Sequence, residues 1–245
     1  MRTIAWHVLV ALVICVTLAL PASAQDISIS LGEDGSLAGR SIQLIMLITV
    51  LSLAPGLAIM VTCFPFIVTV LSILRQAIGL QQSPPNMLIV SLALFLTYFV
   101  MEPVFTAAWD NGISPLVAGT LDVEAATPLV LDPFRDFMAA RVDTDTFRSM
   151  ADLRDTTGQI QLNPDAPLSV LIPSFLLSEI SRAFQIGFLV FLPFLIIDLV
   201  VAAVLMSMGM MMVPPAIVSL PFKLAFFVIA DGWSLIASSL VRSYF

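Results

Sequence analysis

The sequence has very few of the side chains that carry most enzyme chemistry. It contains one histidine, His7, one lysine, Lys223, and two cysteines, Cys15 and Cys63. His7 and Cys15 lie in an N-terminal segment that we expect to be removed, which would leave one thiol and no histidine. Zinc sites, Cys–His nucleophiles and Ser–His–Asp triads would then lack required groups. We therefore expect no enzyme activity, no metal site and no cofactor.

Charge is also scarce. Only 11% of the residues are charged, against roughly 25% in an average soluble domain, while 59% are hydrophobic and the mean hydropathy is +1.04. Several apolar runs exceed the roughly 20 residues that cross a bilayer as a helix. The composition predicts an all-α integral membrane protein, with membrane lipid but no nucleic acid as a partner.

The N-terminus resembles a secretory signal. Arg2 precedes an apolar run over residues 4–20, and Ala22 and Ala24 form an A-x-A cleavage site before Gln25. We expect the mature chain to begin near Gln25, on the outer side of the membrane. A signal anchor that stays attached is the alternative.

Four apolar blocks follow, over residues 43–74, 86–109, 168–205 and 217–241. Pro55 and Pro65 predict kinks or a break in the first block, because each proline removes a helix hydrogen bond. The blocks pair into two helical hairpins. The predicted organisation is a signal peptide (1–24), an N-terminal periplasmic segment (25–42), a first hairpin (43–109), an acidic periplasmic insert (110–167) and a second hairpin (168–245).

The insert is acidic and polar. Residues 110–167 contain ten acids and four arginines, which suits the non-cytoplasmic side, while Arg75 fits a cytoplasmic turn after the first block. Asp132 as N-cap and Pro133 at the first helical position predict a helix start. We expect a small helical subdomain here.

Five charges interrupt the last two blocks: Glu179, Arg182, Asp198, Lys223 and Asp231. Each should face a partner helix or a water-filled lumen, because charge is costly in lipid. Glu179 and Arg182 are spaced for a local ion pair. Lys223 is expected to meet Glu179 or Asp198, within the subunit or across to a neighbour, and Asp231-Gly232 can end a half-helix.

A methionine-rich loop joins the third and fourth blocks before Pro214-Pro215; its methionines are Met206, Met208, Met210, Met211 and Met212. Methionine is unbranched and polarizable, so such a cluster can re-form around objects of different shape. This pattern favours a deformable seal in a pore. The alternative is a turn that merely fills gaps.

Several stretches together resemble the FliP family of flagellar export-gate proteins. They are residues 50–55, 71–86, 183–188, 193–201, 206–212, 214–215, 220–223 and 231–233. The resemblance covers roughly residues 48–105 and 178–245, and it is weakest over 110–167.

The resemblance implies a non-enzymatic subunit of a type III secretion export gate. In that family five FliP copies assemble with FliQ and FliR around a channel for unfolded flagellar proteins, next to FlhB, FlhA and the basal-body ring in the bacterial inner membrane. The five loop methionines then match the family's channel gasket. The resemblance also implies that apolar segments need not cross a bilayer in the mature assembly, and we expect Glu179 and Lys223 to join neighbouring subunits.

Two alternatives stay open. A related subunit of a virulence type III system would usually lack a cleaved signal and have a shorter loop after the second block. A proton-coupled transporter or channel would use Asp198 and Asp231 as relay carboxylates.

Overall fold

The computed structural model describes residues 37–80, 84–154, 160–210 and 212–245. The predicted signal, His7, Cys15 and most of the 25–42 segment lie outside these residues. The chain divides into two compact units, Met1–Val50 and Leu51–Phe245. The described residues form helices and contain no strand, which confirms the all-helical prediction.

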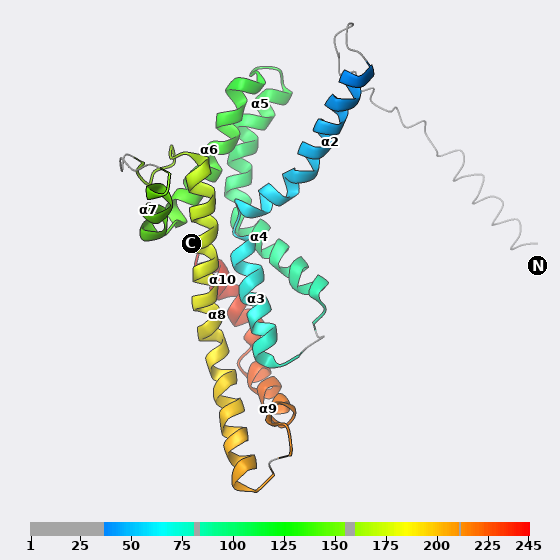
Figure 1. Ribbon diagram of the computed structural model, residues 1–245, viewed down its shortest axis with the longest axis vertical. Coiled ribbons are helices and arrows are strands. Elements are labelled where there is room, and N and C mark those ends of the chain that lie inside the picture. Colours follow the sequence, from blue (N-terminus) through cyan, green and yellow to red (C-terminus); the bar gives the residue numbers. More distant parts are fainter. Residues whose placement is uncertain (1–36, 81–83, 155–159, 211) are drawn as a thin grey trace, which may run out of the picture. The chain divides into compact units, whose positions relative to one another are not determined.

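Ten helical elements are described (Figure 1). They are α2 (Leu37–Met60), α3 (Phe64–Ile78), α4 (Asn86–Ala108), the π-helix η1 (Trp109–Ile113), α5 (Ser114–Val117), α6 (Val123–Arg141), α7 (Thr144–Asp152), α8 (Leu168–Ser207), α9 (Pro215–Ile229) and α10 (Gly232–Arg242). Three stretches are long and apolar enough to cross a membrane: Ser41–Met60, Asn86–Val117 and Leu168–Ser207. The bent pair α9 and α10 makes a fourth if it counts as one span.

The first apolar block is broken, as its prolines predict. α2 runs through Pro55 and ends at Met60, and α3 starts at Phe64 with Pro65 in its first turn, where a missing N–H costs nothing. At 15 residues, α3 is about 22 Å long, too short for a hydrocarbon core of about 30 Å. Its side chains instead make up much of the buried core.

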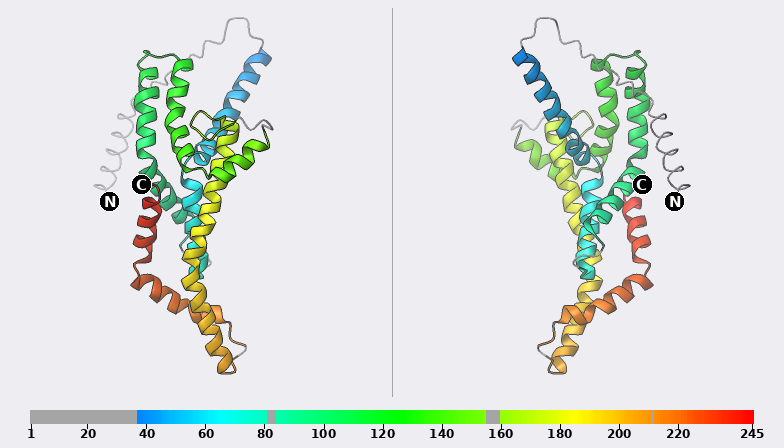
Figure 2. Two further views of the ribbon diagram at one scale, coloured as in Figure 1. Left: turned by 90° about the vertical axis from the view of Figure 1, so that its left-hand side faces the viewer. Right: turned by 90° about the vertical axis from the view of Figure 1, so that its right-hand side faces the viewer.

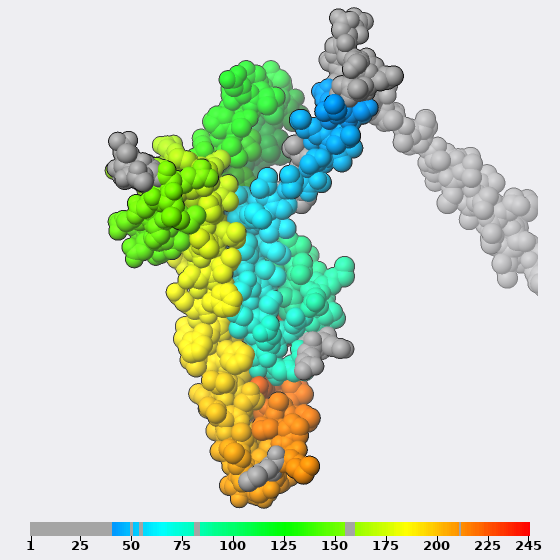
Figure 3. Space-filling view, in the orientation of Figure 1, coloured from blue at the N-terminus to red at the C-terminus, as the bar shows by residue number. Residues whose placement is uncertain are grey.

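α8 is the longest helix, at 40 residues. Its length of about 60 Å is twice the hydrocarbon thickness of a bilayer, so the whole helix cannot lie in lipid. α3 packs along α8 (Figure 3). Gly187 allows this close approach, because a Cβ there would lie 2.3 Å from Cδ1 of Ile73.

Replacing Gly187 with alanine is expected to lower the free energy of unfolding by about 1–3 kcal/mol, because the added methyl overpacks the contact with Ile73. Denaturation with dodecyl sulfate in detergent micelles measures the change. The second variant Ile73→Val removes the atom closest to the new methyl, so Gly187→Ala with Ile73→Val should be more stable than Gly187→Ala with native Ile73.

Gly56→Ala is the matched control, since Gly56 is also inside a helix but has no neighbouring atom within 4 Å of the built Cβ. It should stabilise the chain by about 0.5–1 kcal/mol through helix propensity. Equal effects of the two substitutions would contradict a close contact at Gly187.

The acidic insert contains η1, α5, α6 and α7, so the predicted helical subdomain is present. The predicted helix start at Asp132 and Pro133 is wrong. α6 begins ten residues earlier at Val123, where Asp122 accepts a hydrogen bond of 2.9 Å from the amide of Ala125. Proline need not start a helix when packing holds it, and α6 packs against α4 and α8.

The start of α7 is capped by Asp143. Its carboxylate accepts hydrogen bonds from the amide and hydroxyl of Thr146, at 2.9 and 2.8 Å, and these bonds hold the pKa of Asp143 below its usual value. Behind the cap, α7 buries Phe147 and Ala151 in a cluster with Val170 and Phe175 of α8. The insert therefore shares its core with the first half of α8.

α9 and α10 return from the end of α8 toward its middle (Figure 2). They meet at an angle of 61°. Asp231 between them has φ 47°, a left-handed conformation rare for non-glycine residues. Glycine is needed at position 232, because a Cβ there would lie 2.1 Å from the ring of Phe227. The prediction that Asp231-Gly232 ends a half-helix is confirmed.

Candidate functional site

The methionine-rich loop forms the turn between α8 and α9. Gly209 makes the turn with φ 74°, and Pro214 and Pro215 start α9. The described methionine side chains are exposed, by 62% for Met206, 66% for Met208, 41% for Met210 and 98% for Met212. Met211 lies outside the described residues. Side chains that fill gaps within their own chain would be buried, so the exposure favours contact with something beyond it.

An apolar groove of about 580 Å³ lies beside this loop. Its walls come from the last turns of α8, from the loop and from α9. The lining residues are Ile196, Ile197, Val200, Val201, Val204, Leu205, Met208, Met210, Val218 and Phe222. The loop methionines thus continue an apolar surface rather than cap a polar one.

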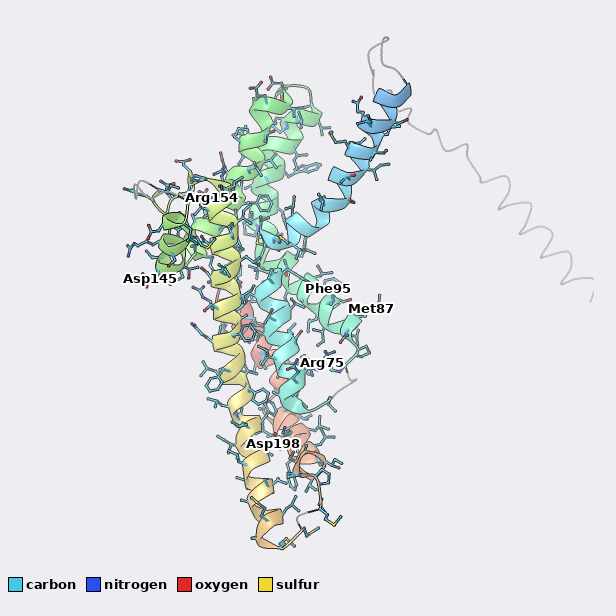
Figure 4. All side chains as sticks on the ribbon, in the orientation of Figure 1. Arg75, Met87, Phe95, Asp145, Arg154 and Asp198 are labelled. Atoms are coloured by element: carbon cyan, nitrogen blue, oxygen red, sulfur yellow. The ribbon has the colours of Figure 1, made fainter. Side chains whose placement is uncertain are left out.

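Lys223 on α9 links this helix to α3 and α8. Its Nζ donates to Oδ2 of Asp198 on α8 at 2.6 Å and to the carbonyl oxygen of Ala77 on α3 at 3.0 Å. The hydroxyl of Ser219 donates to the other oxygen of Asp198. Figure 4 shows Asp198 on α8 at the level of α9. Of the two partners expected for Lys223, the structure selects Asp198.

A second buried charge cluster centres on Glu179, which is fully buried. Nε of Arg141 donates to its Oε1 at 3.3 Å, and the hydroxyl of Tyr244 donates to Oε2. Nη1 of Arg141 donates to the carbonyl oxygen of Ser243 at 2.7 Å, and its guanidinium lies 4.0 Å from the centroid of the Tyr244 ring. The end of α6, α8 and the C-terminus are thereby joined.

This cluster corrects the local pairing expected for Glu179. The carboxylate binds Arg141, which is 38 residues away, and not Arg182 three residues further along α8. Arg182 instead lies near enough to Asp143 to lower its pKa slightly, after the larger effect of Thr146. No local pattern in the sequence pointed from Glu179 to Arg141, because residues that are far apart along the chain are not related by helical spacing.

The structure thus gives the surroundings of each of the five charged residues that were predicted to interrupt the last two apolar blocks. Asp198 and Lys223 form one ion pair, Glu179 belongs to the second cluster, and Arg182 is half-buried on α8. Asp231 is exposed at the α9–α10 bend. A role of Glu179 and Lys223 between subunits stays a prediction.

Sequence patterns did not point to Arg141 and Tyr244 of the Glu179 cluster, nor to Glu102, an exposed carboxylate on α4. Arg141 and Tyr244 lie outside the apolar blocks, where a charged or polar side chain gives no local signal of burial. The sequence could have singled out Glu102, since it is the one carboxylate inside the second apolar block, over residues 86–109.

The fold and these contacts define a helical integral membrane protein whose described buried charges serve as links between helices. Across the four described ranges, no three His, Cys, Asp or Glu side chains group as metal ligands.

Comparison with known proteins narrows this class. The FliP family matches residues 47–240. The flagellar biosynthetic protein FliP of Caulobacter vibrioides is 50% identical over 235 residues, covering 96% of this chain and 88% of that protein. The proteins of the same name from Agrobacterium fabrum and Bacillus subtilis are 46% and 42% identical, over 94% and 89% of this chain and 97% and 98% of theirs. The chain belongs to the FliP family, which confirms the resemblance seen in its motifs.

Family membership and the apolar helices together make the chain a membrane-embedded component of the flagellar export apparatus. It belongs to a family of export proteins rather than of enzymes.

Proposed function

We propose that this chain is a channel-forming subunit of the flagellar type III protein export gate. Several copies, five by the family resemblance, would surround a channel with FliQ and FliR, next to FlhB, FlhA and the basal-body ring. The gate would sit in the bacterial inner membrane, with residues 110–167 in the periplasm. Unfolded flagellar proteins would pass through it, and secretion of these proteins is required to build the flagellum.

The exposure of the loop methionines carries this proposal. Four described methionine side chains project from one hairpin turn without being buried by their own chain. Several copies of the turn around an axis would line the channel with flexible apolar side chains. Such side chains repack around varied peptides and close on one another when no peptide is present. A gate for many substrates needs this property.

The length of α8 is consistent with the proposal. A helix of 40 residues spans about twice the hydrocarbon core, so part of it lies outside lipid, and the acidic insert of the same chain covers only its first half. Its exposed side includes large apolar residues along its length, such as Phe184, Phe188, Leu199 and Val204. Neighbouring copies and the FliQ and FliR partners would cover this side.

The test is ion leakage through the assembled gate. Changing Met208, Met210 and Met212 together to alanine should leave assembly intact but raise small-ion leakage, because three flexible side chains are lost from every copy. Cells that express the chain with its FliQ and FliR partners give the readout as sensitivity of growth to added salts. A rise of about tenfold or more in conductance corresponds to loss of a barrier of about 1.4 kcal/mol.

Met46→Ala is the matched control, since Met46 is 63% exposed but lies on α2, outside the loop sequence. It should leave leakage unchanged. An assembled triple variant that is as tight as the native chain would show that the methionines only shape a turn and that the seal lies elsewhere.

A further inference from the structure

One face of α4 is exposed and rich in large apolar side chains. Figure 4 labels two of them, Met87 and Phe95. The opposite face buries Ile89, Ala93 and Val100 against the core. The exposed face, which we call the α4 face, contains Met87, Leu88, Leu94, Phe95, Tyr98 and Phe99.

Glu102 belongs to the α4 face. It follows Tyr98 by four residues and Phe95 by seven, the spacings that keep side chains on one side of a helix. Its side chain is exposed, and within the described part of the chain no hydrogen bond or ion pair is found for it. It also lies inside the stretch Asn86–Val117, which is apolar enough to cross a membrane. A carboxylate in such a place needs a partner, because lipid cannot solvate it.

Arg242 carries the opposite charge to Glu102 and is likewise exposed and unpaired among the described residues. It ends α10, its side chain is exposed, and the described residues offer it no carboxylate within 4.0 Å. The outer side of α10 near it holds Leu235, Ser238 and Ser239, which are exposed. Small residues allow another helix to approach closely. This side, which we call the α10 face, could therefore receive the bulky aromatic side chains of a helix such as α4.

Glu102 and Arg242 lie at similar positions along the axis of α6, because both are close in sequence to residues that pack on this helix. Phe134 of α6 packs on Phe105 with ring centroids 5.9 Å apart, and Phe137, one turn later, stacks on Tyr244 at 6.0 Å. Glu102 is one turn from Phe105, and Arg242 is two residues from Tyr244. α4 and α6 run in opposite directions (Figure 1), so Glu102, one turn before Phe105, lies near the level of Phe137 and of the Tyr244 ring stacked on it, and Arg242 lies two residues, roughly 3 Å, from that level.

We propose that the α4 face of one copy docks on the α10 face of a second copy, with Glu102 paired to Arg242 of the partner copy. The charges are opposite, neither has an ion-pair partner among the described residues of its own chain, and their similar height lets a rotation about an axis along the helices bring them together. Two unlike faces form a head-to-tail contact, which on repetition arranges copies around an axis and closes into a ring where the rotation between copies closes. The inference rests on the proposed oligomeric gate and names one of its interfaces.

Charge reversal tests the pairing. Glu102→Arg and Arg242→Glu, each made in the full chain expressed with its FliQ and FliR partners, should reduce the detergent-stable oligomer by about tenfold or more, as expected for losing a close interfacial charge pair. The chain that carries both reversals should regain most of the oligomer. Native mass spectrometry measures the fraction assembled.

Co-expression separates contact between copies from contact within one chain. Cells that make the two single-reversal chains together should also regain oligomer, because a reversed Glu102 in one copy then meets a reversed Arg242 in the next. Rescue by the double variant alone, without rescue by co-expression, would place the pair within one chain and overturn the proposal. Glu124→Arg, at an exposed glutamate of α6 outside the apolar stretch, is the control and should leave the oligomer unchanged.

Cross-linking covers the case in which a reversal prevents folding. A chain with Glu102→Cys and Arg242→Cys should form disulfide-linked ladders of two and more copies on mild oxidation, while either single variant should form none. The absence of ladders in an assembled oligomer would overturn this interface and leave the proposed gate intact. A native chain that never assembles with FliQ and FliR would instead refute the proposed function itself.

Discussion

Replacing Arg141 with glutamine is expected to lower the free energy of unfolding by about 3–5 kcal/mol, the usual cost of breaking a buried ion pair by removing one partner. The side chain of Glu179 has no exposed surface and that of Arg141 is 14% exposed, so the remaining carboxylate cannot regain water. The bond from Arg141 to the carbonyl oxygen of Ser243 is lost as well. Denaturation with dodecyl sulfate in micelles measures the loss, and limited proteolysis should show a released C-terminus.

Arg148→Gln provides a control with the same chemistry. Arg148 pairs with Asp145 at 3.9 Å, but the two side chains are 70% and 93% exposed. Loss of such a surface pair costs about 0–1 kcal/mol. If Arg141→Gln were no more destabilising than Arg148→Gln, the cluster around Glu179 would not hold the C-terminus in place.

Replacing Lys223 with methionine should have the second largest effect, about 3 kcal/mol, at the lower end for a buried pair because Asp198 is one-third exposed. Methionine keeps the apolar stem but removes the ammonium group that donates to Asp198 Oδ2 and to the carbonyl oxygen of Ala77. α9 should then detach from α3 and α8. Unfolding in micelles and proteolysis near Pro214 report this change.

Charge exchange identifies the partner of Lys223. The exchange Asp198→Lys with Lys223→Glu should restore part of the lost stability, because it keeps one charge of each sign at the contact. The exchange Glu179→Lys with Lys223→Glu should restore none if both residues act within the chain. Recovery of oligomer assembly by that second exchange would instead support the predicted contact between subunits.

Local patterns in the sequence predicted the features that depend on neighbouring residues. Pro65 marks the break before α3, and Asp231-Gly232 marks the bend before α10, since backbone hydrogen bonding and φ are local properties. The same local argument failed at Asp132 and Pro133, where packing of α6 against α4 and α8 keeps the helix continuous.

The sequence by itself determined the all-helical membrane class, the family and the position of the methionine-rich loop, because hydropathy, proline placement and motif spacing are written along the chain. Only the tertiary structure decided which charges meet. Glu179 is 38 residues from Arg141 and 65 from Tyr244, and Lys223 is 25 from Asp198. A buried charge requires a partner of opposite sign, but which one it finds depends on how whole helices pack, and helix packing joins residues that no local period relates.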